Sequence, residues 1–159
     1  MRFKFYLLKE INIYTLTSPD ATMRYIEGNE LKKAELFMDI ASQVANDSTC
    51  TRARCGSVII SKDGKIIGKG ANSPPGDIEG QRRCSNEKAI YDSKVTDKTC
   101  CIHAEQRAMF DALRSNPDEI AGSRLYFIRL GIEGNPSFSG RPYCTICSKM
   151  ALDLMISEF

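Results

Sequence analysis

The sequence contains no tryptophan and only one histidine, His103. No apolar run approaches the roughly 18 residues that a membrane-spanning helix requires. The formal net charge of +2 is too small to indicate a nucleic-acid or membrane partner by itself. With 42% hydrophobic and 26% charged residues in 159 positions, the composition is that of one soluble globular domain.

The N-terminus resembles the start of a secretion signal, but Lys9 and Glu10 interrupt its apolar run and no small-residue cleavage site follows. We therefore predict a cytoplasmic protein that does not associate with a membrane. Seven cysteines are many for a reducing compartment. In such a compartment this enrichment points to metal binding or catalysis rather than to disulfides.

The pattern divides the chain into an N-terminal extension, residues 1–29, and one domain, residues 30–159. From Glu30 to about Asp47, apolar residues fall three or four apart and predict a helix. Two β-branched runs, 56–61 and 65–70, flank an Asp-Gly pair and predict a β-hairpin.

The second half alternates between loops and regular elements. Residues 71–77 predict a loop, and the polar stretch 77–99 a long surface excursion. A helix is expected from Thr99 or Cys100 to about Ser115, a strand at 124–130, a loop at 131–143 and a helix at 144–154. The buried candidates of the first of these helices are Ala108, Met109, Ala112 and Leu113. The order predicts an α/β fold of three layers, with helices packed on a mixed sheet.

Two short motifs carry metal-binding chemistry. His103 is followed two positions later by Glu105, and Cys144 and Cys147 form a Cys-x-x-Cys pair. One histidine and two cysteines are one ligand short of a closed structural zinc site, and an open position lets zinc activate a water. Glu105, which is not needed as a ligand, is then free to move protons.

Each motif alone has an ordinary explanation. A single histidine on a helix is usually structural, and a Cys-x-x-Cys pair can be a redox motif, although no thioredoxin-like strand precedes this one. Together they are much more specific, because both are expected where a helix begins. There the backbone N–H groups lower thiol pKa values. The combination predicts a catalytic zinc site formed by His103, Cys144 and Cys147, with Glu105 beside it.

These motifs resemble the His-x-Glu and Cys-x-x-Cys signature of zinc-dependent nucleobase deaminases. Residues 48–60, 62–68 and 72–76 are also similar to deoxycytidylate deaminases. The resemblance covers about residues 31–157. It implies a three-layer α-β-α cytidine deaminase-like fold, apparently without the last strand and helix, and a homo-oligomer.

The resemblance implies hydrolytic deamination of a dCMP-like cytosine nucleotide to the uracil nucleotide, with release of ammonia. Water activated by Zn²⁺ attacks the carbon that bears the amino group, and Glu105 moves the protons. By the same resemblance, Asn72 contacts the sugar and Ser57 lines the base pocket. Arg52 is expected either to contact the phosphate or to be an ordinary surface arginine.

The resemblance further implies a second, structural zinc in some relatives. Here four thiols are available for it: Cys50, Cys84, Cys100 and Cys101. The alternative is that these cysteines are ordinary buried or surface thiols.

The sequence differs from the family pattern at two positions near the motifs. Tyr143 separates Pro142 from Cys144, and Arg107 stands where deoxycytidylate deaminases usually have an asparagine. Two other functions remain open: a nucleic-acid-editing deaminase acting on cytosine or adenine, and an inactive zinc-stabilised module. Glu105 argues against the inactive module, because a purely structural site has no use for a proton shuttle.

Overall fold

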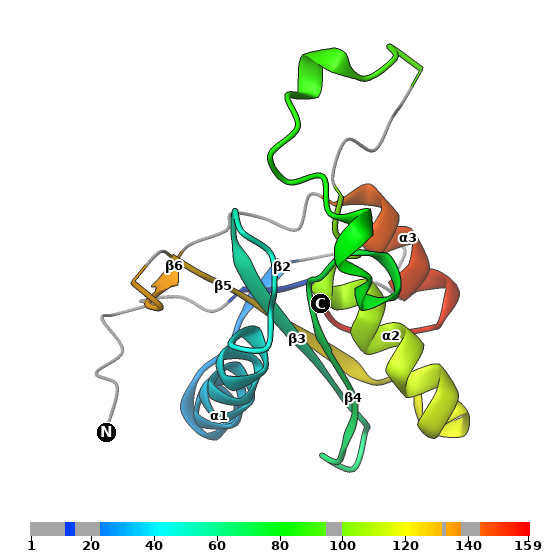
Figure 1. Ribbon diagram of the computed structural model, residues 1–159. Coiled ribbons are helices and arrows are strands. Elements are labelled where there is room, and N and C mark those ends of the chain that lie inside the picture. The colour runs from blue at the N-terminus through cyan, green and yellow to red at the C-terminus, as the bar shows by residue number, and fades with distance from the viewer. Residues whose placement is uncertain (1–11, 15–22, 95–99, 132, 138–143) are drawn as a thin grey trace.

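The computed structural model describes residues 12–14, 23–94, 100–131, 133–137 and 144–159. A four-stranded sheet has the order β4-β3-β5-β6. Its strands are β3 (Arg54–Ile60), β4 (Ile66–Ala71), β5 (Arg124–Leu130) and β6 (Pro136–Ser137). Helix α1 (Gly28–Ala45) covers one face, and α2 (Ala104–Ser115) and α3 (Thr145–Asp153) lie together on the other (Figure 1). The predicted three-layer α/β fold is confirmed.

The pairings between named strands of this sheet are antiparallel. Parallel pairing, expected for a mixed sheet, occurs at one isolated bridge between Arg124 and Glu158. The described part of the chain also contains four single-turn helices: η1 (Pro75–Asp77), η2 (Glu79–Gln81), η3 (Lys88–Ile90) and η4 (Pro117–Glu119). The segment that contains η3 projects from the body of the molecule (Figure 1). None of the described helices is both long and apolar enough to cross a membrane.

The predicted hairpin is present as β3 and β4, and Gly64 in its turn has a φ of 86° that favours glycine. Alternate residues of β3 point to opposite faces of the sheet. Val58 and Ile60 belong to the core under α1, whereas Ile59 belongs to the core under α2. This alternation decides which side chains of β3 reach the functional site.

Small residues let the helices lie very close to the sheet. A Cβ added at Gly56 would meet the backbone of α1 at 2.1 Å from the Ala41 oxygen. A Cβ at Gly70 would lie 2.3 Å from the Ala104 oxygen and 2.4 Å from the Ala108 nitrogen, both in α2. The first turns of α2 are therefore held directly against β4.

Side chains of the α2 region also cover polar groups along β4, which is an edge strand. The Lys69 N–H donates to Asp111 Oδ2 at 2.9 Å, and Asn116 Nδ2 donates to the Ile67 carbonyl at 2.9 Å. These bonds satisfy backbone groups of β4 that no other strand of the described residues pairs with.

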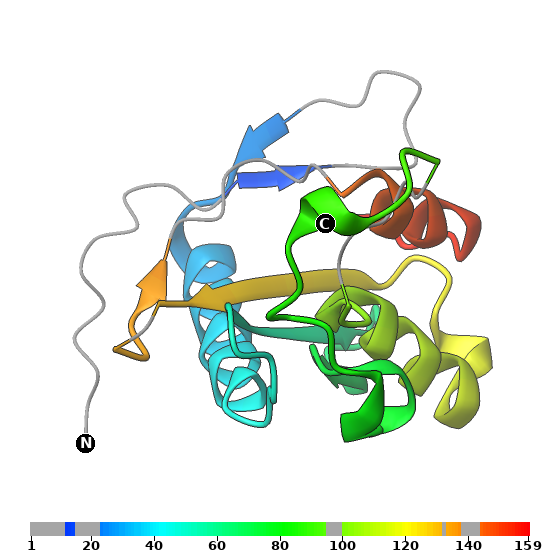
Figure 2. The same ribbon diagram turned by 45° about the horizontal axis from the view of Figure 1, so that its top comes forward.

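The described part of the predicted extension contacts the domain. Strands β1 (Asn12–Tyr14) and β2 (Met23–Tyr25) pair antiparallel, and β2 leads directly into α1 (Figure 2). Ile26 lies in the core under α1. Arg24 donates to Glu30 at 2.6 and 2.8 Å and to Glu158 at 3.0 Å.

Three predictions of local structure were wrong. Helix α2 begins at Ala104 rather than near Thr99, because the Ile102 N–H donates to the Ser73 carbonyl at 2.9 Å and keeps the preceding residues extended. Leu113 is 41% exposed, since it lies about 100° round the helix from buried Ala112, in the last turn. The expected 131–143 loop contains β6, while Pro142 and Tyr143 lie outside the described residues.

Candidate metal centre

His103, Cys144 and Cys147 come together at the adjacent starts of α2 and α3. His103 and Cys144 are the N-cap residues of the two helices, and Cys147 lies in the first turn of α3. His103 Nδ1 is 3.3 Å from Cys144 Sγ and 3.4 Å from Cys147 Sγ. Nitrogen and sulfur ligands of one tetrahedral zinc are about 3.6 Å apart. The three side chains are therefore spaced as zinc ligands and present Nδ1 of the histidine.

The chemistry of these donors also fits a cation. The Cys147 side chain is completely buried, and this burial raises the pKa of its thiol well above the usual range. The negative charges of Glu105 and Cys144 raise it further. A bound divalent ion would reverse this effect, because a coordinated thiol is deprotonated. The residues present thus suit Zn²⁺, whose preferred ligands are thiolates and imidazole.

Glu105 lies in the first turn of α2 and is only 6% exposed. Burial raises the pKa of its carboxyl group, while a backbone hydrogen bond, the charge of His103 and the Cys147 side chain act in the opposite direction. Among the described residues, its carboxylate is not part of the group of three ligand atoms that lie within 4.8 Å of one another. A buried carboxyl next to such a group, but outside it, is free to exchange protons.

Ser57 and Asn72, expected to line the base pocket and to contact the sugar, are both buried and hydrogen-bonded within the protein. Ser57 is fully buried, and its hydroxyl donates to the Tyr126 carbonyl on β5 at 2.9 Å. Asn72 Oδ1 accepts from the Cys55 N–H at 2.8 Å and from the Ser48 hydroxyl at 2.6 Å. Asn72 Nδ2 donates to the Ala53 carbonyl at 2.9 Å. Asn72 therefore joins β4 to the segment before β3, and one N–H of its side-chain amide has no partner among the described residues.

Arg52 is exposed, and its guanidinium donates to the Asn86 carbonyl at 3.4 Å. Its exposure is consistent with both expected roles, a phosphate contact and an ordinary surface arginine.

Cys55 is a neighbour of this site that the sequence did not identify. It shares a face of β3 with Ser57, two positions away, and its backbone is bonded to Asn72. Burial, followed by the negative charge of Glu105, raises the pKa of its thiol to about 12. The thiol therefore stays protonated and neutral near Glu105. Strand alternation, applied from Ser57, could have placed it there.

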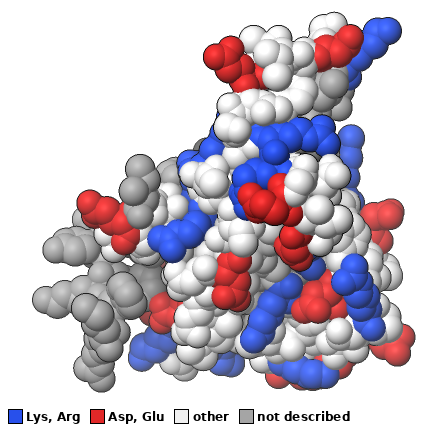
Figure 3. Space-filling model, in the orientation of Figure 1, with Lys and Arg blue, Asp and Glu red and all other residues white. Residues whose placement is uncertain are grey.

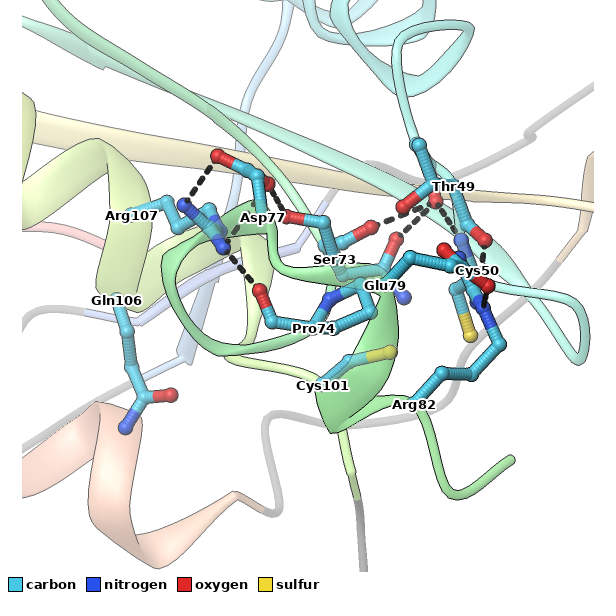
Figure 4. Close-up of polar contacts among 12 residues, drawn as sticks. Thr49, Cys50, Ser73, Pro74, Asp77, Glu79, Arg82, Cys101, Gln106 and Arg107 are labelled. Atoms are coloured by element: carbon cyan, nitrogen blue, oxygen red, sulfur yellow. Dashed lines mark hydrogen bonds and ion pairs between the residues drawn. The ribbon is translucent and has the colours of Figure 1, made fainter.

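The four remaining cysteines lie at a second location. Ligand atoms of Cys50, Cys84 and Cys101 lie within 4.8 Å of one another, and Figure 4 shows Cys50 and Cys101. Cys100 Sγ is 2.9 Å from Cys84 Sγ and 3.7 Å from Cys101 Sγ. Two thiolates on one tetrahedral zinc are about 3.8 Å apart, so Cys84 and Cys100 must separate by about 1 Å to share a metal. We refer to these four residues as the cysteine cluster.

Ionisation in the cysteine cluster is favoured at Cys84. Burial opposes it, but hydrogen bonds from Cys100, Thr51 and Arg82 outweigh burial and lower the pKa of the Cys84 thiol to about 6. Arg82 also donates to the Thr49 carbonyl at 2.7 Å and pairs with Glu79 (Figure 4). A thiolate at neutral pH is the form that binds zinc.

Comparisons with known proteins agree with this geometry. The family model described as the cytidine and deoxycytidylate deaminase zinc-binding region matches residues 31–159. The chain is 29% identical over 101 residues to a deoxycytidylate deaminase of Mycobacterium phage D29. The match covers 60% of this chain and 76% of the phage protein. It is 31% identical over 83 residues to a deoxycytidylate deaminase of Schizosaccharomyces pombe, covering 49% of this chain and 25% of that protein.

A similar fold occurs in the crystal structure of dCMP deaminase from the cyanophage S-TIM5 in complex with dCMP and dUMP. The TM-score is 0.55 at 24% sequence identity, over 82% of this chain and 79% of the phage enzyme.

Proposed function

Since this chain belongs to the cytidine and deoxycytidylate deaminase zinc-binding family, we propose that it hydrolyses the amino group of a cytosine nucleotide such as dCMP. The products are the uracil nucleotide and ammonia. Both relatives described above are deoxycytidylate deaminases, which supports a nucleotide as the substrate. We assign the activity to residues 30–159 and treat residues 1–29 as an extension.

The observation that carries the proposal is the group formed by His103, Cys144 and Cys147, with Glu105 buried two positions after His103, in the first turn of the same helix. Three protein ligands leave one position for water, as in catalytic zinc sites. Bound Zn²⁺ would supply Lewis acidity and lower the pKa of that water.

Glu105 provides the proton transfers that the hydrolysis needs. Its carboxylate takes a proton from the attacking water and delivers it to the ring nitrogen next to C4 of cytosine. It then carries the second proton of the water to the amino group, which leaves as ammonia. Water, cytosine, uracil and ammonia balance without another reactant. Burial of Glu105 raises its pKa, which makes the carboxylate a stronger base for the first step and keeps the carboxyl protonated at higher pH for the second.

The nucleotide contacts follow from the groups that remain available. Asn72 offers one N–H to the sugar, because its other amide groups are bonded within the protein. Ser57 forms part of the pocket wall beside Cys55, with its hydroxyl turned to β5. Arg52 offers an exposed guanidinium to the phosphate.

A small nucleotide also fits the charge on the surface. Basic and acidic side chains are interspersed over the face shown in Figure 3. Proteins that bind single strands use a basic groove that follows the backbone. The face shown lacks such a groove, and this favours a free nucleotide over a strand.

We further propose that the cysteine cluster binds a second, structural zinc. Three of its ligand atoms already lie within 4.8 Å of one another, and the fourth, in Cys100, is next to two of them. A zinc there would connect Cys50 in the segment before β3, Cys84 between η2 and η3, and Cys100 and Cys101 just before α2.

The test is ammonia release by zinc-loaded protein from cytidine, CMP, dCMP, dCTP, guanine and single-stranded DNA. We expect turnover of dCMP, and no release from any of these substrates would contradict the proposal. Glu105→Gln should lower kcat by about 10²-fold or more, because a positioned proton-transfer group contributes about that much. Zinc content, measured by atomic absorption, should not change.

Glu35→Gln is the matched control, since Glu35 is an exposed carboxylate on α1. It should behave as the unmodified protein. Loss of zinc in Glu105→Gln would instead make Glu105 a ligand and would contradict its role as a proton shuttle.

A further inference from the structure

Arg107 connects α2 to the turn after β4. Its Nη2 donates to the Pro74 carbonyl at 2.8 Å, and its Nη1 donates to Asp77 Oδ2 at 3.3 Å. Nη2 also lies 3.2 Å from Asp77 Oδ1. Figure 4 shows the guanidinium between these two residues. One side chain thus binds both ends of η1.

The turn that Arg107 binds has an unusual backbone. Gly76 and Asp77 have φ values of 64° and 58°, and the second is uncommon for a residue with a side chain. The Asp77 N–H donates to the Pro74 carbonyl at 3.0 Å, and the Ser73 hydroxyl donates to the Asp77 carboxylate. The Pro74 carbonyl therefore accepts from both Asp77 and Arg107. These contacts maintain a left-handed conformation that costs energy at Asp77.

Arg107 is held at this position although one of its donors is unused. Its side chain is 23% exposed, and its buried Nε has no hydrogen-bond partner among the described residues. An unsatisfied buried donor is unfavourable, so the Nη contacts must compensate for it. Asp77, by contrast, is 67% exposed. The arginine, rather than the aspartate, anchors the turn.

The same turn is tied to the candidate catalytic residues. The Ser73 carbonyl accepts from the N–H of Ile102, which precedes His103. Asn72 directly precedes Ser73, and Arg107 is two positions after Glu105 on α2. The turn is therefore fixed relative to Glu105 from two sides, by Ile102 and by Arg107.

We propose that Arg107 is a positioning residue that locks residues 73–77 onto α2 and so fixes Asn72 relative to Glu105 for nucleotide binding. The inference rests on the proposed function. It assigns Arg107 no contact with the reacting atoms. Because the lock acts on the binding surface, its loss should affect substrate binding rather than the chemical step.

The test compares the zinc-loaded full chain with Arg107→Ala. We expect KM for dCMP to rise about tenfold, with kcat within about threefold and with unchanged zinc content. Hydrogen exchange at the amides of Asp77 and Ile78, which donate within the turn, should become faster. Arg114→Ala is the matched control, because Arg114 is an exposed arginine in the last turn of α2. It should leave all these quantities unchanged.

Two further variants separate the lock from a general structural effect. Arg107→Lys keeps the positive charge beside Asp77 but loses the planar guanidinium. Its KM for dCMP should therefore lie between those of the unmodified protein and Arg107→Ala. Adding Asp77→Ala to Arg107→Ala should raise KM no further, because both residues act through one network.

Each outcome bears on one proposal. Unchanged KM and unchanged exchange in Arg107→Ala would overturn the lock. So would a loss of zinc or a fall in kcat without a change in KM. If the unmodified protein releases no ammonia, the proposed function fails. Faster exchange in the variant would then still show that Arg107 holds the turn.

Discussion

Replacing Gly70 with alanine tests how closely β4 supports the start of α2. The added Cβ would lie 2.3 Å from the Ala104 oxygen and 2.4 Å from the Ala108 nitrogen. These atoms are the acceptor and donor of one helical hydrogen bond. Real Cβ atoms stay at least 3.0 Å from such neighbours, so the strand and the helix must move apart.

The expected cost follows from the kind of atoms that are displaced. Overpacking a core typically costs about 1–3 kcal/mol. Here the obstacle is backbone rather than a flexible side chain, so we expect about 3 kcal/mol. For a chain of this size that corresponds to a fall in Tm of about 6–12 °C. Because Glu105 lies in the displaced turn, kcat/KM should also fall by about tenfold to a hundredfold.

The assay is thermal unfolding followed by circular dichroism, combined with dCMP kinetics below the transition. Gly80→Ala is the control, because a Cβ there has nothing within 4 Å. Gly68→Ala is a second comparison: its Cβ would meet the Ala108 oxygen at 2.3 Å, one turn further from Glu105. It should destabilise similarly but reduce kcat/KM less. If Gly70→Ala unfolded at the same temperature as Gly80→Ala, the inferred close approach would be wrong.

Two other predictions concern charge and metal. Arg24 holds the pKa of Glu30 below its usual value, despite partial burial, so the stabilisation is complete near neutral pH and is lost as the pH falls through the lowered pKa. Glu30→Gln should therefore lower the free energy of unfolding at neutral pH by less than about 1 kcal/mol, because both charged groups are partly exposed. In acid, this difference from the unmodified protein should disappear. Urea titrations from pH 7 to 3 that showed a constant difference would refute the prediction. Zinc analysis should find two ions per chain in the unmodified protein and in Cys55→Ser, but only one in Cys84→Ser. A single zinc ion in all three proteins would exclude the second site.

Periodicity along the chain was enough to predict most of the architecture. Helix α1 follows from apolar residues spaced three or four apart, and Asp63-Gly64 marks the hairpin because glycine adopts the positive φ of its turn. The start of α2 could not be predicted in this way. It depends on the pairing of Ile102 with Ser73, two residues brought together only by the folded chain.

The candidate site was predictable to a different extent at each position. The convergence of His103 with Cys144 and Cys147 follows from motif spacing, because metal ligands must meet in space. The hydrogen bond from the Ser57 hydroxyl to the Tyr126 carbonyl could not be predicted from the motifs, because it depends on the strand register between residues far apart in sequence. The contacts of Arg107 likewise depend on the conformation of a turn that the sequence indicates only as irregular.

The side chains that cover β4 have a consequence for the behaviour of the protein at high concentration. An uncovered edge strand offers N–H and C=O groups to which a strand of another molecule can add, and such addition begins many aggregates. Asp111 and Asn116 occupy two of these groups on β4. A second molecule would have to displace both side chains before it could extend the sheet there. The helix that carries the candidate catalytic glutamate, together with its C-cap residue, thus also covers the β4 edge of the sheet.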